Sequence, residues 1–133
     1  MMERAKQFTG ARYVSLETFR RSGVPVRTVV WVVEDGGILY VRTSPKSGKV
    51  KRIRNDPRVR IAESNFRGAI TGSWADGAAR FVAGDEANRI LGLFREKYGL
   101  QLKVLGWLGK LSRLGRTNQS QRPSMVVLAV ELT

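Results

Sequence analysis

The residues best suited to do chemistry in this sequence lie in one basic stretch, VRTSPKSGKVKRIRNDPRV, at positions 41–59. Its hydroxyl and glycine residues lie among cations, and Asp56 is the single acid. The members that we single out are Thr43, Ser44, Ser47, Gly48, Lys49, Lys51 and Arg52. Hydroxyl groups, cations and the N–H groups at the start of a helix all bind phosphate well. The stretch therefore predicts a turn that holds an anionic group.

Several anions are compatible with this stretch: a nucleic acid, a membrane surface or a small phosphorylated cofactor. The glycine spacing and the terminal Lys-Ser/Thr pair of a Walker A loop are missing, which disfavours nucleoside triphosphate hydrolysis. The formal net charge of +13 would suit a nucleic acid, with Trp31, Trp74 or Trp107 stacking on bases, but zinc-finger and RNP motifs are absent. Membrane docking through residues 100–114 is disfavoured because glycines interrupt the apolar face. The cations could also form only the solvated face of a helix.

The complete absence of His and Cys narrows the chemistry further. It excludes thiolate nucleophiles, disulfides, imidazole bases and the zinc or copper sites that are built on those ligands. The 11 acidic residues have no spacing typical of a paired catalytic site. An enzyme of this composition is expected to take its chemistry from a cofactor.

The length and composition indicate one globular domain over residues 1–133, with 42% hydrophobic and 26% charged residues. The longest apolar runs are far shorter than the roughly 20 residues that span a bilayer. A basic start followed by an apolar core and a small-residue cleavage site, as in a secretion signal, is absent. We therefore expect a cytoplasmic protein that does not enter a membrane.

Strands separated by glycine-containing turns are predicted over residues 11–41, in the order of a β-meander. The middle strand, with Trp31 near its centre, is almost continuously apolar, which predicts that both of its faces are covered. After Pro45 the pattern changes to a short helix that Ser47 can cap and that ends at Asn55. The phosphate-binding candidates therefore lie where a strand turns into a helix.

The rest of the chain is predicted to add strands and one longer helix. Residues 58–64 alternate as a strand, and residues 69–84 fit a pair of strands around a bend. A helix is expected from Asp85, as its N-cap. Its apolar face is formed by Ala87, Leu91, Phe94 and Tyr98. Glycines interrupt residues 100–122, so short helix turns and a mobile loop are expected there, and an apolar strand at 124–132 closes the chain.

Three segments together carry a family resemblance: YVSLETFRRSGVPVRTVVWVV, LYVRTSPKSGKVKRIRNDPRVRIA and RGAITGSWADGAARF. They resemble the flavin/deazaflavin oxidoreductase superfamily with the pyridoxamine 5'-phosphate oxidase-like fold, and within it the group that depends on coenzyme F420. The resemblance implies a mainly β, antiparallel, FMN-binding split β-barrel with a few helices. It also implies a homodimer in which the cofactor lies in a groove at the interface of the subunits.

The resemblance also implies where the cofactor binds. The phosphate motif of the family falls on Thr43, Ser44, Ser47, Gly48 and Lys49, with Lys51 and Arg52 as adjacent candidates. The segment beside the ring falls on Thr28, Val29, Val30 and Trp31, with Trp74 as a further candidate. Many relatives have proline at the position of Val29, so this chain has an additional N–H beside the ring. Packing in the core is the simpler alternative for both tryptophans.

The function that the resemblance implies is hydride transfer from reduced coenzyme F420 to a small unsaturated or aromatic acceptor. The acidic tail of the coenzyme would lie along Lys51, Arg52 and Arg54, because a single phosphate does not neutralise all of the positive charge. FMN is the alternative cofactor, in a flavin reductase or oxidase of the same fold. A basic nucleic-acid-binding β-barrel is the alternative from another class of protein. No catalytic acid is assigned.

Overall fold

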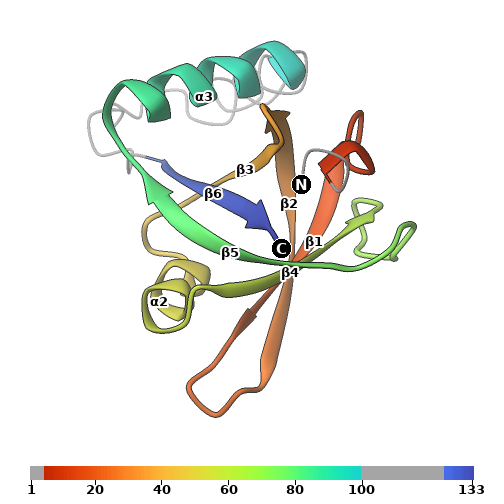
Figure 1. The fold of residues 1–133 in the computed structure, drawn as a ribbon, viewed down its shortest axis with the longest axis vertical. Helices are drawn as coiled ribbons and strands as arrows, with labels where there is room; N and C mark the ends of the chain where they lie inside the picture. The colour runs from red at the N-terminus through yellow and green to blue at the C-terminus, as the bar shows by residue number, and fades with distance from the viewer. Residues whose placement is uncertain (1–4, 100–124) are drawn as a thin grey trace, which may run out of the picture.

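The computed structural model describes residues 5–99 and 125–133 of the chain (Figure 1). In chain order its elements are β1 (Tyr13–Phe19), β2 (Pro25–Asp35), β3 (Ile38–Thr43), α2 (Gly48–Asn55), β4 (Arg58–Ser64), β5 (Ala75–Val82), α3 (Gly84–Lys97) and β6 (Val126–Leu132). This mainly β content with a few helices agrees with the prediction.

The strands form a closed antiparallel barrel in the order β1-β2-β3-β6-β5-β4 (Figure 1). The predicted meander is confirmed, because β1, β2 and β3 are consecutive neighbours in this order. The predicted final strand is also confirmed: β6 pairs with β3 on one side and with β5 on the other. Its apolar sequence fits this position, since most of its residues are buried.

Tight turns and strand register place the first site residues. Gly36 and Gly37, with φ of 62° and 85°, form the turn between β2 and β3, where the left-handed conformation favours glycine. The register of β1 on β2 pairs Tyr13 with Trp31. Val14 and Val30, the next pair, belong to the core inside the barrel. Because side chains alternate across a strand, Tyr13 and Trp31 lie on the outer face of the barrel.

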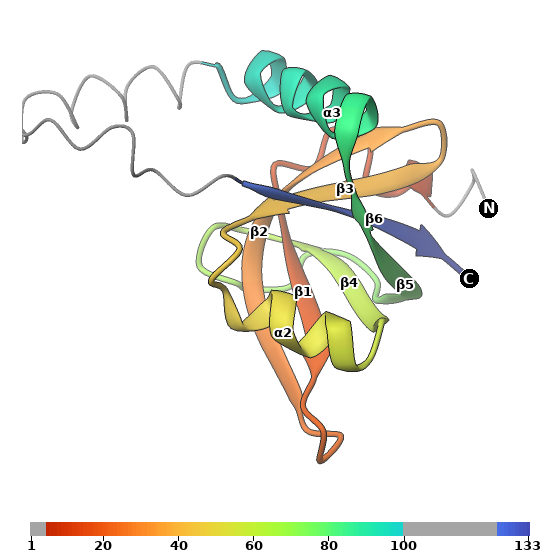
Figure 2. The same ribbon diagram turned by 90° about the vertical axis from the view of Figure 1, so that its left-hand side faces the viewer.

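Two apolar cores stabilise the fold. One fills the barrel and contains Leu16, Ile61 and Leu128. The other lies between the outside of the barrel and α3, which packs against β2 and β6 (Figure 2). Its buried members are Val33, Tyr40, Val82, Ile90, Phe94, Tyr98, Val127 and Ala129. The predicted apolar face of the long helix thus contributes directly to this outer core.

The expectation that both faces of the middle strand are covered is wrong for the first half of β2. Pro25, Arg27 and Val29 are exposed there, whereas β1 is buried from Val14 to Thr18. β1 pairs with β2 and with β4 along most of its length, whereas the first half of β2 pairs with β1 alone. In addition, Arg27 of β2 and Arg60 of β4 reach across the outer face of β1 to the buried Glu17.

Two further expectations need correction. Residues 69–84 contain one strand, β5, and before it Ile70 makes only an isolated bridge to Ser64. α3 begins at Gly84 with Ala83 as its N-cap, so Asp85 lies in the first turn rather than at the cap. A negative charge in the first turn still interacts favourably with the helix dipole. The predicted turns and loop of residues 100–122 lie outside the described residues. Among the helices that the structure describes, none has the length and apolar character to cross a membrane.

Candidate functional site

The predicted strand, turn and helix are present from β3 to α2. Ser47 is the N-cap, as predicted, and its Oγ accepts a hydrogen bond from the Lys49 N–H at 3.2 Å. The Val50 N–H donates to the carbonyl oxygen of Ser47 at 3.2 Å. Two donors of the first helical turn are therefore already used within the protein, so an anion here would rely more on side chains than on the backbone.

Burial of two residues sets the orientation of α2. Val50 and Ile53 are buried, and the helix packs beside β1. The helix ends at Asn55, as predicted, and Pro57 follows one residue after its C-cap Asp56. The cations of α2 lie away from these two apolar residues: Lys49 lines one cavity, and Lys51 and Arg52 line another.

The first cavity has a volume of about 450 Å³ and lies beside Trp31; we call it the Trp31 cavity. Its lining residues are Tyr13, Val29, Val30, Trp31, Arg42, Thr43, Lys49 and Phe66. Val29, Val30 and Trp31 belong to the predicted ring segment, and Thr43 and Lys49 belong to the predicted phosphate motif. The structure therefore brings part of each motif to one cavity.

An aromatic stack supports one wall of the Trp31 cavity. The rings of Trp31 and Tyr98 are parallel within 2°, with centroids 4.3 Å apart. Tyr98 is buried, and its hydroxyl accepts a hydrogen bond from the Val32 N–H at 3.1 Å. The guanidinium of Arg42 lies 5.8 Å from the centre of the Trp31 ring. Trp31 is only half-buried, so it packs against Tyr98 and also borders the cavity.

Lys49 and Arg42 make the Trp31 cavity electropositive. None of its lining residues is acidic, and neither cation forms an ion pair within the described residues. Burial, and then the neighbouring Arg52, lower the pKa of the Lys49 ammonium. Burial, and then Arg95, lower the pKa of the Arg42 guanidinium. A bound anion would offset both the desolvation and the repulsion.

The lowered pKa of Lys49 predicts that binding of an anion in the Trp31 cavity is linked to uptake of a proton. An anion beside the ammonium favours its charged form and raises the pKa again, so at alkaline pH binding of inorganic phosphate should take up a proton. Without an anion, stability should rise as the pH passes upward from the lowered pKa toward the ordinary one, since the unfolded chain holds the proton longer. Calorimetry in two buffers of different ionisation enthalpy measures the uptake. Lys49→Ala should abolish it, and uptake that persists in this variant would contradict the assignment.

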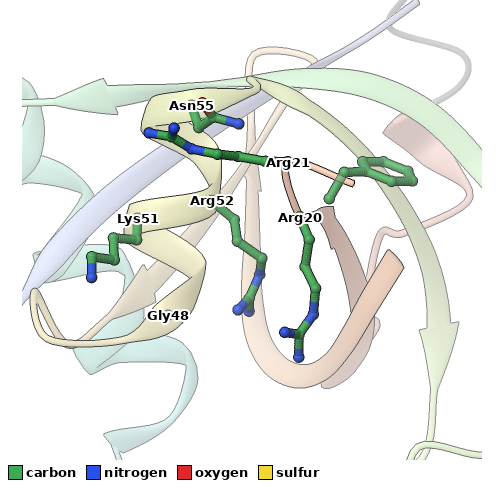
Figure 3. A pocket seen from close by; sticks show the side chains of 7 residues that line it. Arg20, Arg21, Gly48, Lys51, Arg52 and Asn55 are labelled. Carbon is green, nitrogen blue, oxygen red and sulfur yellow. The ribbon is translucent and has the colours of Figure 1, made fainter. Parts of the chain in front are cut away.

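A second cavity, of about 380 Å³, lies between α2 and the turn that joins β1 to β2 (Figure 3). We call it the Arg52 cavity. Its lining residues are Phe19, Arg20, Arg21, Gly48, Lys51, Arg52 and Asn55. Three predicted site residues, Gly48, Lys51 and Arg52, are thus directed to this second cavity rather than to the one beside Trp31.

The other predicted residues line neither cavity. Ser44 and Ser47 lie in the turn before α2, where their hydroxyls accept hydrogen bonds from backbone N–H groups. The Thr28 hydroxyl is buried and has no hydrogen-bond partner among the described residues. The guanidinium groups of Arg27 and Arg60 lie over the Trp74 ring, at 4.8 and 4.9 Å from its centre.

Sequence reasoning did not include three residues of the Trp31 cavity: Tyr13, Arg42 and Phe66. Arg42 directly precedes Thr43 in the basic stretch, so its position next to the predicted phosphate motif could have indicated it. Tyr13 could be found only through its cross-strand pairing with Trp31. Phe66 follows β4, and no local pattern relates it to β2. Within the described residues, no group of His, Cys, Asp and Glu is arranged to hold a metal ion.

Comparison with solved structures identifies the class of fold. A protein from Listeria innocua provisionally assigned as a pyridoxamine 5'-phosphate oxidase has a TM-score of 0.66 and 14% identity, over 98% of this chain and 92% of its own. The heme storage protein of Vibrio cholerae has a TM-score of 0.68 and 16% identity, over 98% and 89%. An F420 reductase has a TM-score of 0.62 and 18% identity, over 92% and 87%.

These likenesses establish the fold: the chain is a pyridoxamine 5'-phosphate oxidase-like split β-barrel. Proteins of this fold in the comparison differ in what they bind, since they include an F420 reductase and a heme storage protein. No protein-family model matches the chain, and no curated protein matches it in sequence.

Proposed function

We propose that this protein is an oxidoreductase that binds the deazaflavin coenzyme F420 in the Trp31 cavity and reduces a small unsaturated or aromatic acceptor. The observation that carries the proposal is that three residues of the ring segment, among them Trp31, line one cavity together with Thr43 and Lys49 of the phosphate motif. The structural likeness to an F420 reductase supports it at the level of the fold.

The residues of the Trp31 cavity fit a flat ring that carries a phosphate. Val29, Val30 and Trp31 offer apolar and aromatic surface for the ring, while Thr43 and Lys49 offer a hydroxyl and an ammonium for the phosphate. Arg42 adds a further cation without an acidic partner in the described residues. The volume of about 450 Å³ is within the range of small-molecule sites.

The coenzyme supplies the hydride when it is bound. The residues of this chain would hold the ring against Val29 and Trp31, exclude water from it, and neutralise the phosphate with Lys49. Such a role needs no imidazole or thiol, which agrees with the absence of His and Cys. The same absence removes the His and Cys axial ligands that many heme proteins use, so heme fits the chain less well.

We further propose that two chains form a homodimer that covers this cavity. Two hydrophobic lining residues are exposed in the single chain: Val29 at 36% and Phe66 at 64%. Burial of such side chains by a second copy would exclude water from the ring. Light scattering of the purified protein should give twice the chain mass, and a monomer that still binds F420 with full affinity would contradict this arrangement.

FMN is the second candidate, because the same phosphate-binding residues would accept its phosphate. A titration of the apo-protein with coenzyme F420 and with FMN in parallel, at moderate salt, distinguishes the two. Tight binding of F420 with weak binding of FMN is the result that we expect. Tight FMN binding would assign the flavin branch instead. Failure of both, with affinity for single-stranded nucleic acid that falls steeply with salt, would favour nucleic-acid binding.

Trp31 provides an internal probe of where the ring binds. Its indole borders the cavity, so the ring should quench its fluorescence, and Trp31→Phe should lose this part of the signal. Trp74→Phe is the matched control and should keep the quench, because Trp74 contacts Arg27 and Arg60 and does not line the Trp31 cavity. A quench that persists in Trp31→Phe but disappears in Trp74→Phe would move the ring to Trp74.

A further inference from the structure

The Arg52 cavity brings four cations together from two elements that are distant in sequence. Arg20 and Arg21 come from the turn after β1, and Lys51 and Arg52 come from α2. None of the four forms an ion pair with an acid within the described residues. By contrast, other arginines among the described residues are paired with acids; Arg80, for example, pairs with Glu86 and Glu131. The charge of this cavity is therefore not neutralised by the protein.

Arg52 is held in place at the wall of this cavity. Its Nε donates a hydrogen bond of 2.6 Å to Oγ1 of Thr18, which is fully buried. Only Nε takes part in this hydrogen bond, so the two terminal nitrogens of the guanidinium do not contact Thr18 through it. One of them, Nη1, lies over Gly48: a Cβ added to this glycine would be 2.7 Å away. The absence of a side chain at Gly48 thus makes room for the Arg52 guanidinium.

Arg20 lies close enough to affect Arg52. Burial, and then the charge of Arg20, lower the pKa of the Arg52 guanidinium. Figure 3 shows both side chains extending in the same direction, with their guanidinium groups near each other. Two guanidinium groups in this arrangement repel each other unless an anion lies between them, and their planar N–H donors suit the oxygens of phosphate or carboxylate.

We propose that the Arg52 cavity is a second anion site, which binds a multiply charged phosphate or carboxylate group between Arg20 and Arg52. The acidic tail of the proposed coenzyme and a separate small polyanion are two sources of this chemistry. The site does not depend on the proposed function, because its lining shares no residue with that of the Trp31 cavity.

Calorimetry with inorganic pyrophosphate tests the site on the full-length protein. Arg20→Ala and Arg52→Ala should each weaken binding about tenfold or more, the effect of losing a charged hydrogen bond. Arg54→Ala is the matched control, because it removes the same charge from the same helix. The sequence suggested Arg54 as a further contact of the acidic tail, but the structure places its guanidinium over Phe81 and outside the cavity lining. Equal losses in all three variants would overturn the proposal, since they would indicate only a diffuse positive field.

Gly48→Ala tests the same site without removing a charge. The new methyl group would displace the Arg52 guanidinium, while alanine favours the helix more than glycine does. Pyrophosphate affinity should therefore fall while the thermal unfolding temperature is maintained. This variant and Arg20→Ala keep the test decisive if Arg52→Ala misfolds. Full affinity in both would overturn the proposal.

Competition identifies the source of the anion. Displacement of pyrophosphate by coenzyme F420 but not by FMN would assign the cavity to the acidic tail, and displacement by neither would assign it to a separate small anion. Both results uphold the site, and the second does so even if the proposed function fails. Tight binding of a single-stranded oligonucleotide that all three arginine substitutions weaken equally would overturn it.

Discussion

Lys49→Ala will weaken binding of coenzyme F420 about tenfold to 150-fold, which corresponds to about 1.5–3 kcal/mol. Lys49 lines the Trp31 cavity, is half-buried and has no acidic partner within the described residues. Its pKa is lowered by burial and by Arg52, so a bound phosphate would stabilise this ammonium more than it would stabilise that of an exposed lysine. Isothermal calorimetry of the purified variant measures the loss.

Lys46→Ala is the control for this substitution. Lys46 is exposed in the turn just before α2, and removing it changes the net charge equally. Lys46 does not line the Trp31 cavity, and its backbone N–H, which bonds to Ser44, is retained in the variant. F420 affinity should therefore stay near that of the wild type. Equal losses in the two variants would indicate a general effect of charge, and unchanged affinity in Lys49→Ala would remove Lys49 from the phosphate site.

Tyr98→Ala will lower the free energy of unfolding by about 3–5 kcal/mol, the usual cost of truncating a large buried aromatic residue. Only 1% of Tyr98 is exposed, and its ring packs against Phe94 and against the face of Trp31. A domain of this size is usually stable by about 5–15 kcal/mol, so the loss is a large share of the total. Urea unfolding followed by circular dichroism measures it.

Two comparison variants separate the causes of that loss. Tyr98→Phe keeps the ring but leaves the Val32 N–H without the Tyr98 hydroxyl as acceptor, which should cost about 1–3 kcal/mol. Val24→Ala shortens an apolar side chain that is 53% exposed in the turn before β2, and it should change stability by about 0.5 kcal/mol or less. If Tyr98→Ala costs no more than Tyr98→Phe, the stack on Trp31 does not stabilise the protein.

Local pattern was sufficient for much of the fold. The glycines of the β2–β3 turn, the apolar runs of β1 to β3 and the serine cap of α2 act over a few residues, so their effects could be predicted from neighbouring residues. Prediction failed where distant groups decide the outcome. β2 reads as the most apolar strand, yet β1 is the covered one, because its barrel neighbours supply arginines that cross its outer face to Glu17.

The site was predicted in part for the same reason. The basic stretch and the Trp31 segment are visible as separate motifs, and barrel closure brings Trp31 and Lys49 to one cavity. Lys49 and Arg52, three residues apart, lie on the same side of α2, yet they line different cavities, because Arg52 is held by its hydrogen bond to Thr18. Neighbours in sequence thus serve different cavities, which a linear motif does not distinguish.

By itself, the sequence determined the mainly β fold, the strongly basic character of residues 41–59 and the absence of imidazole and thiol groups, because these depend on residue types and short-range spacing. Only the tertiary structure decided which cations share a cavity, that Tyr98 supports Trp31, and that Arg20 faces Arg52. These relations join residues from different strands and helices. They are fixed by how the barrel closes and how α2 and α3 pack on it, and no local pattern contains that information.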